Sequence, residues 1–89
     1  MVLHPVRLQP KGMKKAALPL SFGRAVRRLR EQAGYSQERF AAQAHIDRTY
    51  MSEIERGTTN VSLEIIGRLA RTLGIDLADL FAEVDREAK

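Results

Sequence analysis

The sequence predicts an all-α fold of five short helices around one core, and three observations support this prediction. From Leu20 onward, apolar residues recur at spacings of three and four, the period of a helix with one buried face. Capping residues precede these segments, and glycines end three of them. No segment alternates apolar and polar residues as a half-buried strand would. The 89 residues suffice for one domain, and the absence of cysteine excludes disulfides and thiolate metal sites.

Residues 1–19 show neither helical nor alternating periodicity, and they contain all three prolines of the chain. We therefore expect a basic, flexible N-terminal arm over 1–19, followed by a folded domain over 20–89. Because every apolar stretch of the arm is short and interrupted, neither a secretory signal nor a membrane span is expected. The predicted location is cytoplasmic.

Charge is distributed unevenly along the chain. Residues 1–30 contain eight Lys or Arg and no acid, whereas the rest contains seven basic and eleven acidic side chains. A basic N-terminal region favours a polyanionic partner, first nucleic acid and second an anionic membrane surface. An ordinary solubilising tail is the alternative, and charge alone does not decide between them.

The first two helices have clear start and stop signals. The first is predicted from Ser21, a capping residue type, to Ala33, with Gly34 as its stop. The second is predicted from Ser36, also a capping type, to Ala44. The expected apolar stripe of the first helix is Phe22, Val26, Leu29 and Ala33, and that of the second is Phe40, Ala41 and Ala44.

The third and fourth helices follow the same logic. Asp47 is expected to cap the third helix, which ends at Arg56 before Gly57. The fourth helix begins after Ser62 and stops at Gly74. The inward positions are Met51 and Ile54 in the third helix, with Ile46 before it, and Leu63, Ile66, Leu69, Ala70 and Leu73 in the fourth.

The fifth helix starts at Asp76 and offers more apolar surface than a terminal helix needs. Leu77 and Leu80 are expected to face the core, while Phe81 and Val84 extend beyond it. We therefore expect a homodimer through a C-terminal dimerisation helix, with Leu77, Phe81 and Val84 at the interface. The alternative is that Phe81 only covers the core of its own protomer.

The second and third helices have the spacing of a helix-turn-helix, with the tight turn His45-Ile46 between them. Ala41 is small enough for the two helices to cross closely, and the buried positions leave a polar outer face on the third helix. A ten-residue helix is about 15 Å long and fits a major groove about 12 Å wide. The residues on its exposed face are Arg48, Thr49, Ser52 and Glu53.

These residues resemble the Cro/C1-type (XRE) helix-turn-helix family over about residues 20–81. The matching positions are Ser36-Gln37-Glu38, Ala41, Ile46, Ile54-Glu55-Arg56-Gly57, Ser62-Leu63, Leu69-Ala70 and Leu73-Gly74. Within that family, residues 48–57 and 60–63 are similar to the controller proteins of restriction–modification systems. The resemblance implies a lambda-repressor-like DNA-binding domain and a sequence-specific regulator of transcription.

Two positions depart from the family pattern. His45 stands in the turn where the family usually has glycine, so a positive φ there would carry a cost. Thr58 and Thr59 occupy the connector where the family often has Lys or Arg. We therefore expect weaker phosphate contacts from this connector, or contacts made by backbone N–H groups.

The third helix would be the recognition helix of such a domain, and four of its side chains are expected to contact DNA bases. Arg48 suits the O6 and N7 atoms of guanine, with a phosphate contact as the alternative. Thr49 could touch a thymine methyl group or simply fill the helix, and the hydroxyl of Ser52 suits a base or a phosphate. Glu53 could accept from the N4 amine of cytosine, or pair with Arg48 or Arg56 instead.

The expected DNA backbone contacts are Gln37, Tyr50, Thr58, Asn60, Lys14 and Lys15. Gln37 matches the family position that binds a phosphate beside a helix N-terminus. For Tyr50, packing is the alternative to a phosphate contact. The resemblance also implies a partly buried structural ion pair between Arg30 and Glu55, with two independent surface charges as the alternative.

Catalysis is not expected, because the chain contains only two histidines, His4 and His45, and no nucleophile–base spacing, phosphate loop or metal cluster. No cofactor, metal or membrane partner is predicted. The expected partners are double-stranded DNA, a second copy of the chain bound to a pseudo-palindromic operator, and, for a regulator, RNA polymerase. The competing interpretation is an antitoxin or protein-binding adaptor for which DNA contact is secondary.

Overall fold

The computed structural model describes residues 17–88, which form five helices in the order α1 (Ala17–Gln32), α2 (Gln37–Ala44), α3 (Arg48–Arg56), α4 (Leu63–Leu73) and α5 (Leu77–Ala88). No strand occurs in this range, so the predicted all-α class is confirmed. None of the described helices has the length and apolarity that a bilayer crossing requires. The arm residues Lys14 and Lys15 lie outside the described residues.

Helix α1 begins earlier than the sequence suggested. It starts at Ala17 rather than Ser21, so the predicted helix start is wrong and Ser21 lies buried inside the helix. Pro19 is tolerated because the N–H groups of a first turn have no partner within the helix. At the other end, Ala33 lies beyond the helix and is exposed, so it is not part of the apolar stripe.

The caps of α2 and α3 agree with the sequence. The Ser36 hydroxyl accepts a hydrogen bond from the N–H of Arg39, and the Asp47 carboxylate accepts from the first turn of α3. Both helices end in the left-handed region, at His45 (φ 58°) and at Gly57 (φ 74°). Glycine adopts this conformation freely, whereas His45 does so at a cost.

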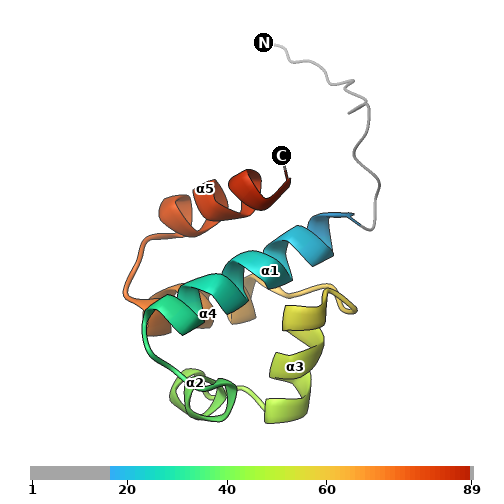
Figure 1. Cartoon of the computed structure of the whole chain (residues 1–89). Helices are drawn as coiled ribbons and strands as arrows, with labels where there is room; N and C mark the ends of the chain where they lie inside the picture. Colours follow the sequence, from blue (N-terminus) through green and yellow to red (C-terminus); the bar gives the residue numbers. More distant parts are fainter. Residues whose placement is uncertain (1–16, 89) are drawn as a thin grey trace.

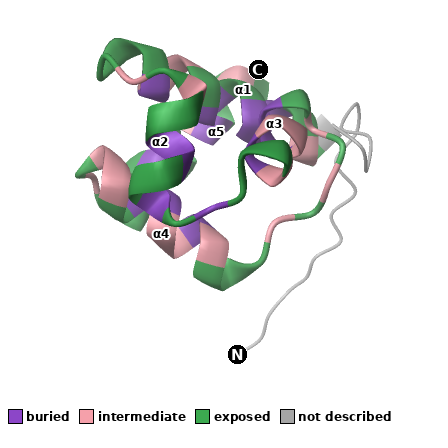
Figure 2. Cartoon of the chain, turned by 90° about the horizontal axis from the view of Figure 1, so that it is seen from below, coloured by how far each residue is buried: buried purple, intermediate pink, exposed green. Residues whose placement is uncertain are grey.

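The core draws on all five helices, and α1 lies between α5 and the α2–α3 pair (Figure 1). Its largest fully buried side chains are Val26, Phe40, Met51, Ile54, Leu69 and Leu80. Helices α1 and α3 meet at Gly23, where an added Cβ would lie 2.3 Å from the carbonyl oxygen of Ile54. Helix α3 therefore lies directly on the α1 backbone, and the buried faces of the helices point inward (Figure 2).

In helix α5, Leu80 and Phe81 lie on the expected sides, whereas Leu77 and Val84 do not. Leu80 and Val84 are buried, whereas Leu77 and Phe81 are 50% and 41% exposed. Residues four apart share one helix face, so Leu80 pairs with Val84 on the inward face and Leu77 pairs with Phe81 on the outward face. The expectations that Leu77 faces the core and that Val84 extends beyond it are wrong.

Leu63 was also expected in the core, but it is 83% exposed. It is the first residue of α4, directly after the Ser62 cap, and the buried stripe of that helix starts one turn later at Ile66. The predicted bounds of α4, from Ser62 to Gly74, are confirmed.

Candidate nucleic-acid interface

Helix α3 presents a polar stripe to solvent. Its inward side chains, Met51 and Ile54, are fully buried and hold the helix against the core. Arg48, Ser52 and Arg56 follow one another at intervals of four residues, so they lie along one face of the helix. This stripe contains two guanidinium groups and a hydroxyl, all of which can donate hydrogen bonds to nucleic acid.

A surface hollow of about 250 Å³ separates this stripe from the start of α2. Its lining residues are Gln37, Arg48, Thr49, Ser52 and Arg56. The structure thus brings together Gln37, expected at a phosphate, and three of the four side chains expected at bases. Glu53 does not line the hollow and is half-buried beside it.

Arg56 also lines this hollow, although the sequence did not indicate it as a DNA contact. Its Nη1 atom donates a 2.6 Å hydrogen bond to the Oγ of Ser52, not to Glu53 as the alternative interpretation had it. This contact holds the guanidinium along the stripe and leaves the hydroxyl proton of Ser52 free to donate. The spacing of eight residues from Arg48 is the signal that could have identified Arg56.

The connector after α3 uses its polar groups internally. Both the N–H and the hydroxyl of Thr58 donate to the carbonyl oxygen of Glu53, at 3.1 and 3.2 Å. A phosphate contact from that hydroxyl would have to replace the second bond. Asn60 is exposed, whereas Tyr50 is half-buried and packs against the core, which favours the packing alternative for Tyr50.

Arg30 and Glu55 meet in a buried, two-pronged contact between α1 and α3. The Nε and Nη2 atoms of Arg30 donate to Oε2 and Oε1 of Glu55 at 2.7 and 3.0 Å, and the two side chains are only 8% and 4% exposed. Nη1 of Arg30 donates to the backbone oxygen of Tyr35 at 2.8 Å. The hydrogen bond to Glu55 is the main cause that raises the pKa of Arg30.

The same carboxylate reaches the hollow. Nε2 of Gln37 donates a 3.0 Å hydrogen bond to Oε1 of Glu55, so Gln37 bridges the buried pair and the surface. Neither sequence spacing nor residue type indicated this contact, because it depends on how α2 and α3 cross.

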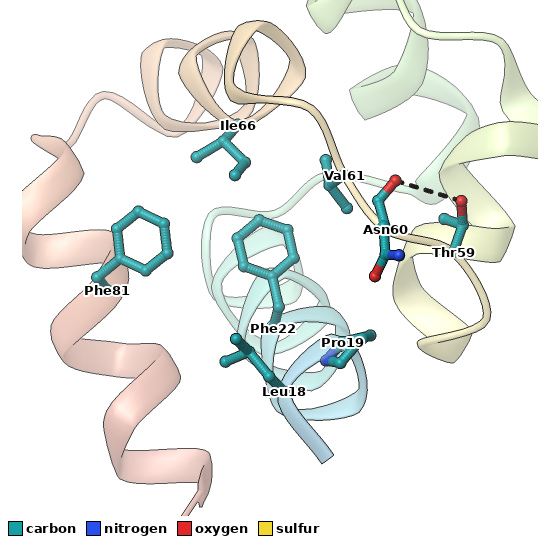
Figure 3. Close-up of a pocket in the computed structure, with 8 residues that line it drawn as sticks. All are labelled: Leu18, Pro19, Phe22, Thr59, Asn60, Val61, Ile66 and Phe81. Atoms are coloured by element: carbon teal, nitrogen blue, oxygen red, sulfur yellow. Dashed lines mark hydrogen bonds between the residues drawn. The ribbon is translucent and has the colours of Figure 1, made fainter. Parts of the chain in front are cut away.

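A second hollow, of about 230 Å³, lies on another part of the surface and is mainly apolar (Figure 3). It is lined by Leu18, Pro19, Phe22, Thr59, Asn60, Val61, Ile66 and Phe81. The rings of Phe22 and Phe81 lie side by side in it, with centroids 6.2 Å apart. Phe81 is thus the member of the expected dimer interface that reaches this hollow, while Leu77 is exposed on the same helix and Val84 is buried.

Comparison with known proteins gives a consistent set of relatives. The sequence profile of a helix-turn-helix domain matches residues 21–83. Control protein C.MunI from a Mycoplasma species is 44% identical over 71 residues, which cover 79% of this chain and 96% of the relative. The restriction-modification controller protein C.AhdI from Aeromonas hydrophila has a similar structure, with a TM-score of 0.69, 43% identity, and coverage of 71% of this chain and 96% of that chain.

A third similar structure was solved with DNA. It is the restriction-modification controller protein C.Esp1396I, as a tetramer in complex with its natural 35 base-pair operator. Its TM-score to this chain is 0.74 at 25% identity, over 80% of this chain and 93% of that chain.

Proposed function

This chain belongs to the helix-turn-helix domain family, and we propose that it is a sequence-specific, DNA-binding regulator of transcription that controls a restriction–modification system. The observation that carries this proposal is the hollow in which Gln37 of α2 faces the polar stripe of α3. The similarity to C.MunI and C.AhdI supports the controller type, and the operator complex of C.Esp1396I supports DNA as the ligand.

Helix α3 enters the major groove with its N-terminus foremost. Arg48, Thr49, Ser52 and Glu53 contact base edges there, and Arg56 adds a cation at the other end of the stripe. Gln37, in the first turn of α2, contacts a phosphate, since a helix N-terminus favours an anion. Further backbone contacts come from Asn60, Lys14 and Lys15, and from Thr58 if its hydroxyl exchanges the bond to Glu53 for a phosphate, whereas Tyr50 packs against the core.

The regulator acts as a homodimer on a pseudo-palindromic operator. One recognition helix reads only a few base pairs, whereas two copies double the readout and favour half-sites about 34–36 Å apart. The outward face of α5, where Leu77 and Phe81 are half-exposed, supplies apolar surface for the second copy. Val84 supports this face from inside the protomer. Contact with RNA polymerase stays a prediction of the regulator role.

The test is selection of a binding site from random duplexes, followed by affinity measurements over a range of salt concentrations. We expect one preferred site, and log K falling linearly with log salt by about 0.9 for each phosphate neutralised. Binding that ignores both sequence and salt would contradict the proposal and favour the antitoxin or adaptor interpretation.

Two variants separate base readout from backbone contact on the selected site. Arg48→Ala should cost about 1–3 kcal/mol and relax the preference at one base pair. Gln37→Ala should weaken binding to all duplexes by a similar factor, because a phosphate carries no sequence information. If both variants lost affinity uniformly, Arg48 would have to be reassigned to a phosphate.

A further inference from the structure

The buried carboxylate of Glu55 accepts three hydrogen bonds. Two come from Arg30 on α1, and the third comes from Nε2 of Gln37 on α2. Arg30 is itself held by the backbone oxygen of Tyr35, in the loop between α1 and α2. A continuous chain of polar contacts therefore runs from the interior to the hollow that faces DNA.

This contact determines how the Gln37 amide is oriented. An ionised carboxylate only accepts hydrogen bonds, so the amide must turn its NH₂ group, not its oxygen, toward Glu55. One N–H is used in this way and one remains. Phosphate oxygens also only accept, and the remaining N–H is therefore the atom of this amide that can serve a DNA backbone.

The carboxylate of Glu55 does not repel the DNA phosphate, because the guanidinium of Arg30 balances its negative charge within the same contact. The two guanidinium bonds also hold the carboxylate in place, so its Oε1 atom offers Gln37 a fixed acceptor. A glutamine without this acceptor would have to give up rotamer freedom when it bound DNA.

We propose that Glu55, held by Arg30, is a positioning residue for DNA binding that orients the amide of Gln37 so that its second N–H donates to a phosphate oxygen. This inference rests on the proposed DNA-binding function. It assigns Glu55 a role in affinity in addition to its role in joining α1 to α3.

The test is a double-mutant cycle with Glu55→Gln and Gln37→Ala on the selected duplex, at a temperature at which circular dichroism shows every variant folded. The amide introduced by Glu55→Gln can both donate and accept, so it no longer dictates which side of Gln37 faces it. We expect each single variant to bind about tenfold more weakly, and the double variant to bind no more weakly than Gln37→Ala alone. Glu55→Asp, which keeps the charge but shortens the reach, serves if Glu55→Gln does not fold.

Glu83→Gln is the matched control, since Glu83 also accepts from an arginine of α1 but shares no hydrogen-bond partner with Gln37. It should leave DNA affinity unchanged. The positioning role would be overturned if the affinity losses of Glu55→Gln and Gln37→Ala multiplied in the double variant. It would also be overturned if a folded Glu55→Gln variant bound DNA with wild-type affinity. Both results would leave the proposed function intact. Failure of the wild-type chain to bind any selected duplex would overturn both.

A second measurement needs no variant. In the NMR spectrum of ¹⁵N-labelled wild-type protein, the two side-chain amide protons of Gln37 should respond differently to the duplex. The Gln37 amide proton that is hydrogen-bonded to Glu55 should keep its chemical shift. The other Gln37 amide proton should change its chemical shift when DNA binds. A duplex with a neutral methylphosphonate at the contacted phosphate should abolish that movement, and an equal response of both protons would overturn the proposal.

Discussion

Helix α1 carries two arginines that build two different junctions. Arg30 meets Glu55 of α3, and Arg28 meets Glu83 and Glu87 of α5 at 3.0 and 2.8 Å. Positions two apart on a helix are separated by about 200°, which explains why the partners lie on opposite sides of α1 (Figure 1). The contact distances are alike, but the surroundings are not.

The difference is burial. At the α3 junction, the side chains of Arg30 and Glu55 are 8% and 4% exposed. At the α5 junction, the side chain of Arg28 is 34% exposed, and those of its two glutamate partners are 24% and 23% exposed. A buried ion cannot recover its hydration when its partner is removed, so the loss is large. Water reaches the α5 junction and screens it, so the loss there is small. One junction holds α3, the helix proposed to read DNA, and the other ties α5 to α1.

The largest effect is expected from Glu55→Ala at the buried junction. Removing the carboxylate leaves the Arg30 charge without compensation, which costs about 3–5 kcal/mol of unfolding free energy. For so small a domain this amounts to loss of the fold at growth temperature. Thermal denaturation checks it, and a variant that melts like the wild type would show that the junction contributes nothing.

Arginine titration does not complicate that comparison. Hydrogen bonds to the carboxylates raise the pKa of both Arg28 and Arg30 above their ordinary value. A raised pKa gives stability that is fully present below the unfolded value and is lost only as the pH rises through the folded one. Both arginines therefore remain charged throughout the neutral range, and melting differences between the junctions reflect burial.

A second prediction concerns the seat of α3 on α1 at Gly23. Gly23→Ala places a Cβ 2.3 Å from the carbonyl oxygen of Ile54, which neither backbone can avoid without moving. We expect a loss of about 1–3 kcal/mol, or more if α3 shifts away from Glu55. Chemical denaturation gives the number, and Gly67→Ala, whose Cβ would meet open space, is the control. Equal stability of the two variants would show that α1 and α3 can separate freely.

Features set by interactions within one helix could be predicted from the sequence, whereas contacts between helices could not. Caps such as Ser36 and Asp47 follow from chemistry within one turn, and they were predicted correctly. Pro19 obscured the start of α1, because its effect depends on whether it falls in a first turn or inside a helix. In α5, Leu80 and Phe81 were placed correctly but Leu77 and Val84 were not, because periodicity shows that apolar stripes exist but not which stripe packs against the core.

The candidate site divides in the same way. Arg48, Thr49 and Ser52 follow from the face of one helix, and the structure places them together. The contact of Gln37 with Glu55 joins residues 18 positions apart on two helices, and the α5 junction joins residues 55 and 59 apart. Such contacts require the crossing of helices, which local patterns do not contain.

A third prediction concerns the outer face of α5. Phe81→Asp places a charge beside Phe22 in the apolar hollow and should prevent association with a second copy. Sedimentation at micromolar concentration should show a dimer for the wild type and a monomer for the variant. The variant should keep the circular dichroism spectrum of a helical protein, and with it the α3 junction. A wild type that is monomeric there and on its selected DNA would remove this interface.

The smallest effect is expected at the partly exposed α5 junction, from Glu83→Gln combined with Glu87→Gln. Arg28 then loses both carboxylate partners, yet screening by water limits the loss of unfolding free energy to about 1 kcal/mol. The double variant should therefore melt only a few degrees below the wild type. In 1 M salt, where the Debye length is about 3 Å, this difference should shrink, because salt weakens the attraction between charges that water reaches. The cost of Glu55→Ala should persist at the same salt, since ions do not reach a side chain that is 4% exposed. A salt response shared by both junctions would mean that burial does not distinguish them.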